Sequence, residues 1–125
     1  IGYDEQFDNN GDYTIDYPHM YFTAPVAGVY QFNGWSWCAT NTNEKQLRVF
    51  KKPVANANTT WASWVANQNP EHTFISKAGV LSHSWCMKLA AGDEVEIRNW
   101  SATADQFYDN GGNSNYHGFS GFLVG

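Results

Sequence analysis

The segment between residues 105 and 116 has the side chains best suited to binding a ligand. It reads Asp-Gln-Phe-Tyr-Asp-Asn-Gly-Gly-Asn-Ser-Asn-Tyr, which places carboxylate and amide oxygens beside aromatic rings. Ca²⁺ prefers such hard oxygen ligands, and amides next to aromatic rings can hold a sugar. The segment predicts a carbohydrate site and leaves Ca²⁺ open as a cofactor on Asp105 or Asp109; a solvated loop is the alternative. The predicted sugar-binding residues are Tyr108, Asp109, Asn110, Asn113, Asn115 and Tyr116.

Six tryptophans are more than a core of this size can bury. An exposed indole can stack on a sugar ring and also donate a hydrogen bond. We expect Trp61 and Trp64 to be exposed and to bind carbohydrate, because polar segments border them on both sides. The core or a subunit interface is the commoner role for any single tryptophan.

The residue types of enzyme active sites are present without the spacing that catalysis needs. No His-Glu-x-x-His pattern occurs, and no Cys-x-x-Cys spacing indicates a zinc site. Ser120 lies in a predicted strand rather than in a Gly-x-Ser-x-Gly elbow. Asp93 and Glu94 fall in a tight turn, which does not suit a pair of glycosidase carboxylates. The sequence predicts no catalytic residue and no enzymatic activity; its scattered histidines are His19, His72, His83 and His117.

Composition narrows the class of protein. The chain has 125 residues, enough for one domain with a real core, and it is rich in aromatic and poor in charged residues, which favours strands. A net charge of -5 argues against nucleic-acid binding. No apolar run approaches the roughly 20 residues of a membrane span, so no membrane insertion is expected. No initiator Met or leader pattern stands at Ile1, which is typical of a mature or trimmed chain. Asn58 and Asn99 begin glycosylation sequons, which favours a secreted protein.

The stretch from Tyr21 to Trp37 organises the predicted secondary structure. Pro25 to Gly28 should form a turn, and the residues after Gly28 alternate with the period of a half-buried strand. No amphipathic helix is expected, and about ten short strands predict a sandwich or jelly roll. The other predicted strands are Tyr3–Phe7, Tyr13–Tyr17, Gln46–Lys51, Trp61–Ala66, Thr73–Lys77, Val80–Leu89, Glu94–Trp100 and Tyr116–Val124.

Four motifs in this order resemble those of the globular head domain of complement component 1q, in the tumour necrosis factor superfamily. Together they cover nearly the whole chain. They are Tyr-Asp-x-x-Phe-x-x-Asn-Gly-x-Tyr from Tyr3, Phe-x-x-Pro-x-x-Gly-x-Tyr-x-Phe from Phe22, Leu-x-x-Gly-Asp-x-Val from Leu89, and Phe-Ser-Gly-Phe-Leu from Phe119.

The resemblance implies an all-β, ten-stranded jelly roll that forms a homotrimer, with central-strand aromatics along the threefold axis. Residues 1–125 then form a single globular domain in which the first family strand and the collagen stalk are absent. The resemblance also makes the strands that contain Cys38 and Cys86 neighbours, so a disulfide between these cysteines is expected, with two buried thiols as the alternative. The family calcium site is not expected, because residues 71–77 contain no Asp.

We therefore predict a secreted, trimeric, non-enzymatic domain. Its predicted function is to bind carbohydrate, as a pattern-recognition lectin of innate immunity does. Three weak sites on one rigid head would give avidity for repeated microbial or cell-surface groups. Two alternatives stay open. One is a structural, matrix or biomineral module that mainly trimerises, and the other is a cytokine-like receptor ligand.

Overall fold

The computed structural model describes residues 13–16, 19–38, 43–77, 79–101 and 117–125. Side chains of residues 13–20, 37, 80, 117 and 118 are outside the description, as are the predicted strand Tyr3–Phe7 and the segment 105–116. In chain order the elements are β1 (Tyr13–Asp16), β2 (His19–Thr23), β3 (Gly28–Trp37), β4 (Lys45–Lys52), a 3-10 turn (Val54–Asn56), α1 (Trp61–Ala66), β5 (His72–Ser76), β6 (Val80–Leu89), β7 (Glu94–Ser101) and β8 (His117–Leu123).

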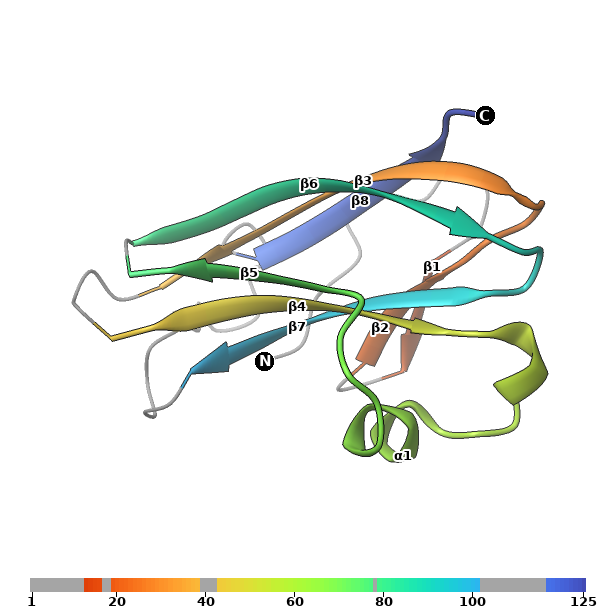
Figure 1. Cartoon of the computed structure of the whole chain (residues 1–125), viewed down its shortest axis with the longest axis horizontal. Coiled ribbons are helices and arrows are strands. Elements are labelled where there is room, and N and C mark those ends of the chain that lie inside the picture. The colour runs from red at the N-terminus through yellow and green to blue at the C-terminus, as the bar shows by residue number, and fades with distance from the viewer. Residues whose placement is uncertain (1–12, 17–18, 39–42, 78, 102–116) are drawn as a thin grey trace.

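The strands form two antiparallel sheets that face each other (Figure 1). One sheet has the order β1-β2-β7-β4-β5, and the other has the order β6-β3-β8. The turn predicted at Pro25 to Gly28 joins β2 in the first sheet to β3 in the second, because proline and glycine interrupt the ladder there. The prediction of an all-β sandwich of two facing sheets is confirmed.

Aromatic rings fill the space between the sheets, with Phe32 of β3 at the centre. Its ring is stacked at 5.6 Å on Trp85 of β6 and meets the edge of Phe22 of β2 at 5.4 Å. Phe32 and Leu47 are fully buried, so the two sheets exclude water between these positions. Because successive side chains of a strand point to opposite faces, the alternate residues Tyr30, Phe32 and Gly34 all face this core.

Gly121 of β8 lies directly opposite Phe32 of β3, and a side chain cannot fit there. A Cβ at Gly121 would overlap the Cδ1 and Cε1 atoms of the Phe32 ring. The nearest obstacle is a core ring rather than a flexible side chain, so the strands would have to move apart. The glycine in Phe-Ser-Gly-Phe-Leu is therefore required by packing.

We predict that Gly121→Ala lowers the free energy of unfolding by about 1–3 kcal/mol, the usual cost of overpacking a core. Ser120→Ala, on the exposed face of the same strand, is the matched control and should change it by less than about 0.5 kcal/mol. Urea unfolding of the two variants measures both values. Equal stabilities would contradict the packing of Phe32 against Gly121.

A stack of three rings closes the side of the sandwich between the edge strands β5 and β6. Phe74 of β5 lies between His72, at 6.0 Å, and His83 of β6, at 4.3 Å, with all three rings nearly parallel. Phe74 also contacts Trp85, which continues the stack into the core. Burial lowers the pKa of His83 because the charged imidazolium loses solvation there.

This stack predicts a loss of stability in acid. The pKa of His83 lies below its unfolded value of about 6.5, so the unfolded chain binds the proton more readily and stability falls as the pH drops below that value. His83→Phe keeps an aromatic ring and removes the titration. We expect the difference in unfolding free energy between pH 7.5 and pH 5 to be smaller in this variant than in the wild type. Parallel pH curves for the two proteins would refute this origin.

The prediction that Trp61 to Ala66 form a strand is wrong, because these residues form the helix α1. The Oγ1 atom of Thr60 accepts a hydrogen bond from the backbone N–H of Ser63 at 3.2 Å, which caps the first turn. In a strand Trp61 and Trp64 would point to opposite faces. In a helix residues three apart share a face, so both indoles turn toward β4 and β7.

The expected disulfide between Cys38 and Cys86 is also wrong. β3 and β6 are neighbours, as the resemblance implied, but the backbone N–H of Cys38 binds the carbonyl of Gly79, whereas Cys86 pairs with Gln31. Seven residues therefore separate Cys86 from the position opposite Cys38, roughly 20 Å at about 3.3 Å per residue. Cys38 is buried and Cys86 is exposed, so the two thiols also point to opposite faces of the sheet.

Candidate functional site

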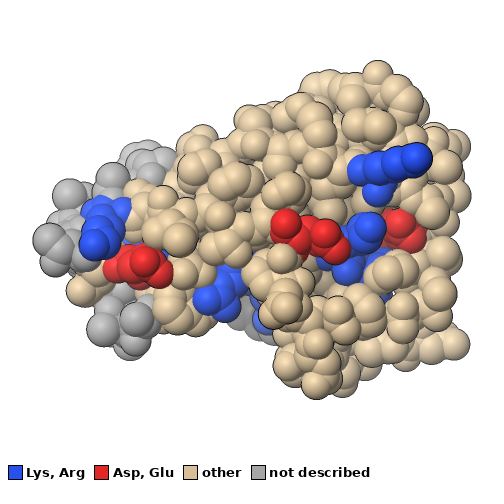
Figure 2. Space-filling model, in the orientation of Figure 1, with Lys and Arg blue, Asp and Glu red and all other residues tan. Residues whose placement is uncertain are grey.

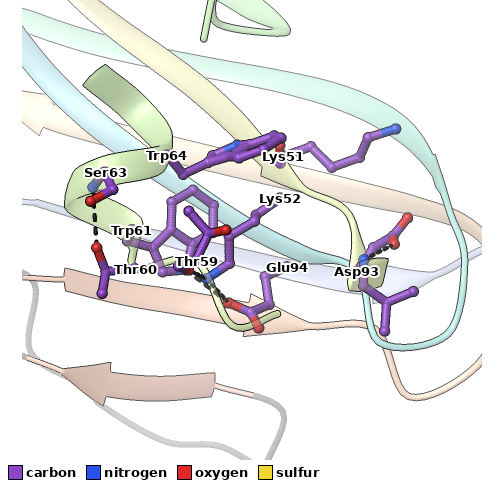
Figure 3. A network of polar contacts seen from close by, with 10 residues as sticks. Lys51, Lys52, Thr59, Thr60, Trp61, Ser63, Trp64, Asp93 and Glu94 are labelled. Atoms are coloured by element: carbon purple, nitrogen blue, oxygen red, sulfur yellow. Dashed lines mark hydrogen bonds and ion pairs between the residues drawn. The ribbon is translucent and has the colours of Figure 1, made fainter. Parts of the chain in front are cut away.

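The helix α1 and the start of β7 enclose a cluster of polar and aromatic side chains (Figure 3). The helix projects below β4 in the view of Figure 1. Trp61 is buried, and its indole Nε1–H donates to Glu94 Oε1 at 2.8 Å. Its ring lies 6.0 Å from that of Tyr21, on β2. The first tryptophan of the helix is thus fixed on both its apolar and its polar side.

Lys52 at the end of β4 is the charged centre of this cluster. Its Nζ lies 3.4 Å from Glu94 Oε1, 2.6 Å from the carbonyl of Thr59 and 5.2 Å from the centre of the Trp61 ring. Only 5% of the Lys52 side chain is exposed. A buried ammonium requires such partners, because the loss of solvation is otherwise very costly. These contacts fasten the segment before α1 to the sheet.

Two further contacts tie this end of the fold together. Trp64 Nε1–H donates to the carbonyl of Lys51 at 2.9 Å. The carboxylate of Asp93, in the turn between β6 and β7, accepts from the backbone N–H groups of Val54 at 3.0 Å and Ala90 at 2.9 Å. The Asp of the Leu-x-x-Gly-Asp-x-Val motif therefore holds the 3-10 turn against the β6–β7 turn.

These contacts correct the prediction that Trp61 and Trp64 are exposed sugar-binding residues. Trp61 is buried and Trp64 is half-buried, and each uses its indole N–H inside the protein. An indole whose N–H is engaged in this way has no donor left for a ligand. Both tryptophans anchor the connection from β4 to β5.

We predict that Trp61→Phe destabilises the fold more than Trp64→Phe. Trp61 loses a hydrogen bond to a carboxylate, worth about 1.5–3 kcal/mol, whereas Trp64 loses one to a neutral carbonyl, worth about 0.5–1.5 kcal/mol. Chemical denaturation of both variants gives the two values. Loss of glycan binding by either variant at unchanged stability would instead restore the sugar-binding hypothesis.

A second polar and aromatic group lies on the outer face of the five-stranded sheet. The guanidinium of Arg48 on β4 lies 4.4 Å from the centre of the Trp100 ring on β7, and its Nε–H donates to Gln46 Oε1 at 2.7 Å. Gln46 Nε2 in turn donates to Glu44 at 2.7 Å. Arg98 is the direct neighbour of Arg48 across the β4–β7 ladder and forms an ion pair with Glu96 at 2.8 Å.

This group was missed at the level of sequence, although a signal for it existed. Arg48 and Arg98 are the only arginines in the chain, and the predicted strands Gln46–Lys51 and Glu94–Trp100 contain both of them. What could not be predicted is that these strands pair, with the register that sets one arginine opposite the other.

Figure 2 shows charged residues of both signs along a band of a largely uncharged surface.

The outer face of the three-stranded sheet has a different character. Phe122 and Val124 near the C-terminus are exposed, as is Val29. The polar residues beside them are small or uncharged: Ser84 donates to Asn33 at 2.5 Å, and the Cys86 thiol donates to Gln31 Oε1 at 3.0 Å. The β3 and β6 registers place Lys88 beside Val29 at the rim of this face.

The remaining predicted site residues have mixed outcomes. The sugar-binding and calcium candidates of the 105–116 segment lie outside the described residues. Asn58 is exposed between the 3-10 turn and α1, which suits a glycan. Asn99 accepts a hydrogen bond from the buried Ser36 at 2.6 Å, so its side chain faces the opposite sheet and is poorly placed for glycosylation.

No metal centre is found in the described part of the chain, and the buried thiol of Cys38 is not activated. No group of three or more His, Cys, Asp or Glu side chains there could hold a metal ion. Burial raises the pKa of the Cys38 thiol, and the nearby Lys45 ammonium acts in the opposite direction with the smaller effect. A thiol with a raised pKa is a poor nucleophile at neutral pH. Among these residues no helix is long and apolar enough to cross a membrane.

Comparison with known proteins agrees with this architecture. The crystal structure of rabbit GITRL, a ligand of the tumour necrosis factor family, superposes with a TM-score of 0.52 at 14% identity, over 89% of this chain and 74% of that one. The fold is therefore a jelly-roll sandwich of the tumour necrosis factor type. A family model of the C1q domain matches residues 3–124, and the chain belongs to the C1q domain family. A comparison with curated protein sequences finds no match.

Proposed function

We propose that this protein is a secreted, non-enzymatic recognition domain that trimerises and binds carbohydrate on repetitive surfaces. Membership of the C1q domain family supports the recognition role. The observation that carries the proposal is the contrast between the two outer faces. One face combines exposed apolar side chains with small uncharged polar ones and suits contact between protomers, and the other carries the half-buried pair of Arg48 and Trp100.

The outer face of β6-β3-β8 is the proposed trimer interface. Phe122 is 55% exposed and Val124 53%, and β3 contributes Val29 to the same face. Large apolar side chains grouped on a sheet face mark an interaction surface. The small polar residues Asn33, Ser84 and Ser120 leave this face flat, so a second copy can approach closely. Threefold packing of this face would remove the exposed Phe122 from water.

Carbohydrate would bind at the surface left open by such packing. The candidates are the 105–116 segment with Asp109, Asn110 and Tyr116, together with Arg48 and Trp100 on the outer face of the five-stranded sheet. Single sugar sites are weak, so three copies on one rigid head would increase the apparent affinity for a repetitive target. Ca²⁺ stays open as a cofactor, because its candidates Asp105 and Asp109 lie in that segment.

We predict that the wild type sediments as a trimer at micromolar concentration and that Phe122→Asp sediments as a monomer. Ile75→Asp is the matched control, because Ile75 is also 55% exposed but lies on β5, in the other sheet. This control should remain a trimer. On a glycan array, with and without Ca²⁺, the wild type should bind and the Phe122→Asp monomer should bind at least about 100-fold more weakly, through lost avidity.

Three outcomes would contradict parts of the proposal. A monomeric wild type would reject the trimer. A trimer that binds no glycan in either buffer would favour a structural module. Binding to cells that no sugar competes away would favour a receptor ligand.

A further inference from the structure

We propose that Arg48, held on the ring of Trp100, binds the carboxylate of an acidic sugar. This inference rests on the proposed function and names its ligand class. The two residues lie on the outer face of the five-stranded sheet, on the neighbouring strands β4 and β7. Arg48 thus becomes the recognition residue, and Trp100 the positioning residue that fixes the plane of its guanidinium.

The first argument is the placement of the two arginines. They are the only arginines of a chain with net charge -5, and they are direct cross-strand partners. Like charges opposite each other destabilise a pair of strands. Arg98 is compensated by Glu96 at 2.8 Å, whereas Arg48 contacts the Trp100 ring and the neutral amide of Gln46. Arg48 therefore carries a positive charge that no carboxylate of the described residues contacts.

The second argument is the orientation of the guanidinium. Its face is covered by Trp100 at 4.4 Å, and its Nε–H is used by Gln46 at 2.7 Å. Gln46 is itself held by Glu44 at 2.7 Å, so the arrangement is fixed from both strands. Among the described residues none accepts from the N–H groups on the terminal nitrogens, which could therefore meet a ligand in the plane of the fork. A carboxylate matches this fork with two parallel hydrogen bonds.

The third argument identifies a sugar as the carrier of the carboxylate. Ile75 of β5 lies beside Gln46 in the ladder and is 55% exposed, and Trp100 lies on the other side of Gln46. The apolar side chains of this row can contact the C–H face of a sugar ring while Arg48 holds its carboxylate. The chain carries a net charge of -5, so binding depends on this local contact rather than on a positive field.

Binding to immobilised polygalacturonate, a polymer of a carboxylate-bearing sugar, tests the proposal. We expect the wild-type trimer to bind it and to bind the fully methyl-esterified polymer at least 10-fold more weakly, because the ester carries no charge. Arg48→Gln should lower the affinity at least 10-fold. Arg48→Lys keeps the charge but loses the fork, and it should lose most of the affinity as well.

Lys77→Gln is the matched control. It removes one positive charge from an exposed position beyond the end of β5 and should leave the affinity unchanged. Trp100→Leu should weaken binding although Arg48 is still present. Thermal unfolding and sedimentation should be used to check that each variant is a folded trimer. Sulfated dextran is a further probe. If Arg48→Lys still binds sulfated dextran as well as the wild type does but no longer binds polygalacturonate, selective recognition of the carboxylate is supported.

The opposite results would overturn the proposal. Equal binding of the acid and ester polymers shows that the carboxylate is not recognised. Equal losses in Arg48→Gln and Lys77→Gln show a general charge effect. Binding of neutral glycans alone rejects an acidic ligand but leaves the proposed function intact, whereas absence of binding to every glycan, neutral or acidic, rejects both.

Discussion

The packing of Phe32 between the two sheets is the constraint on which the rest of the structure depends. Its ring touches aromatic residues of β2, β3, β6 and β8, so it joins strands that are distant in the sequence. A core packed this closely tolerates little change in volume. That requirement explains the glycine at position 121, and it fixes which face of β3 and β8 points inward. The composition of both outer faces follows from this choice.

The same density explains why the tryptophans serve the fold rather than a ligand. Trp85 extends the core toward the edge strands, where Phe74 and His83 close the gap between the sheets. Trp61 and Trp64 fasten a long connection to the outer face of the five-stranded sheet. A large ring with one donor can seal an edge and satisfy a polar atom at once. Trp100 differs, because its ring supports a charged side chain at the surface.

In our proposal one outer face forms the trimer and the other binds carbohydrate. A face with little charge can be covered by identical copies, since it has few charges to desolvate. On the other face the guanidinium of Arg48 lies half-buried against the Trp100 ring, and this is where the proposed ligand would bind. Trimerisation and recognition then place no conflicting demands on one surface. The geometry of the two sheets separates the functions, because each strand sends alternate side chains to opposite sides.

The sequence by itself determined the class of fold, the order of most strands and the turn at Pro25 to Gly28. These features follow from local periodicity and from proline and glycine, and the family motifs from Phe22, Leu89 and Phe119 lie in the described strands and the turns between them. It did not determine α1, because a six-residue helix is too short for a periodic signal and is stabilised by the contacts of Trp61 and Trp64. The register of the ladders was decided only by tertiary structure. That register separates Cys38 from Cys86 and brings Arg48 to Arg98, since a shift of one residue exchanges the inner and outer faces of a strand.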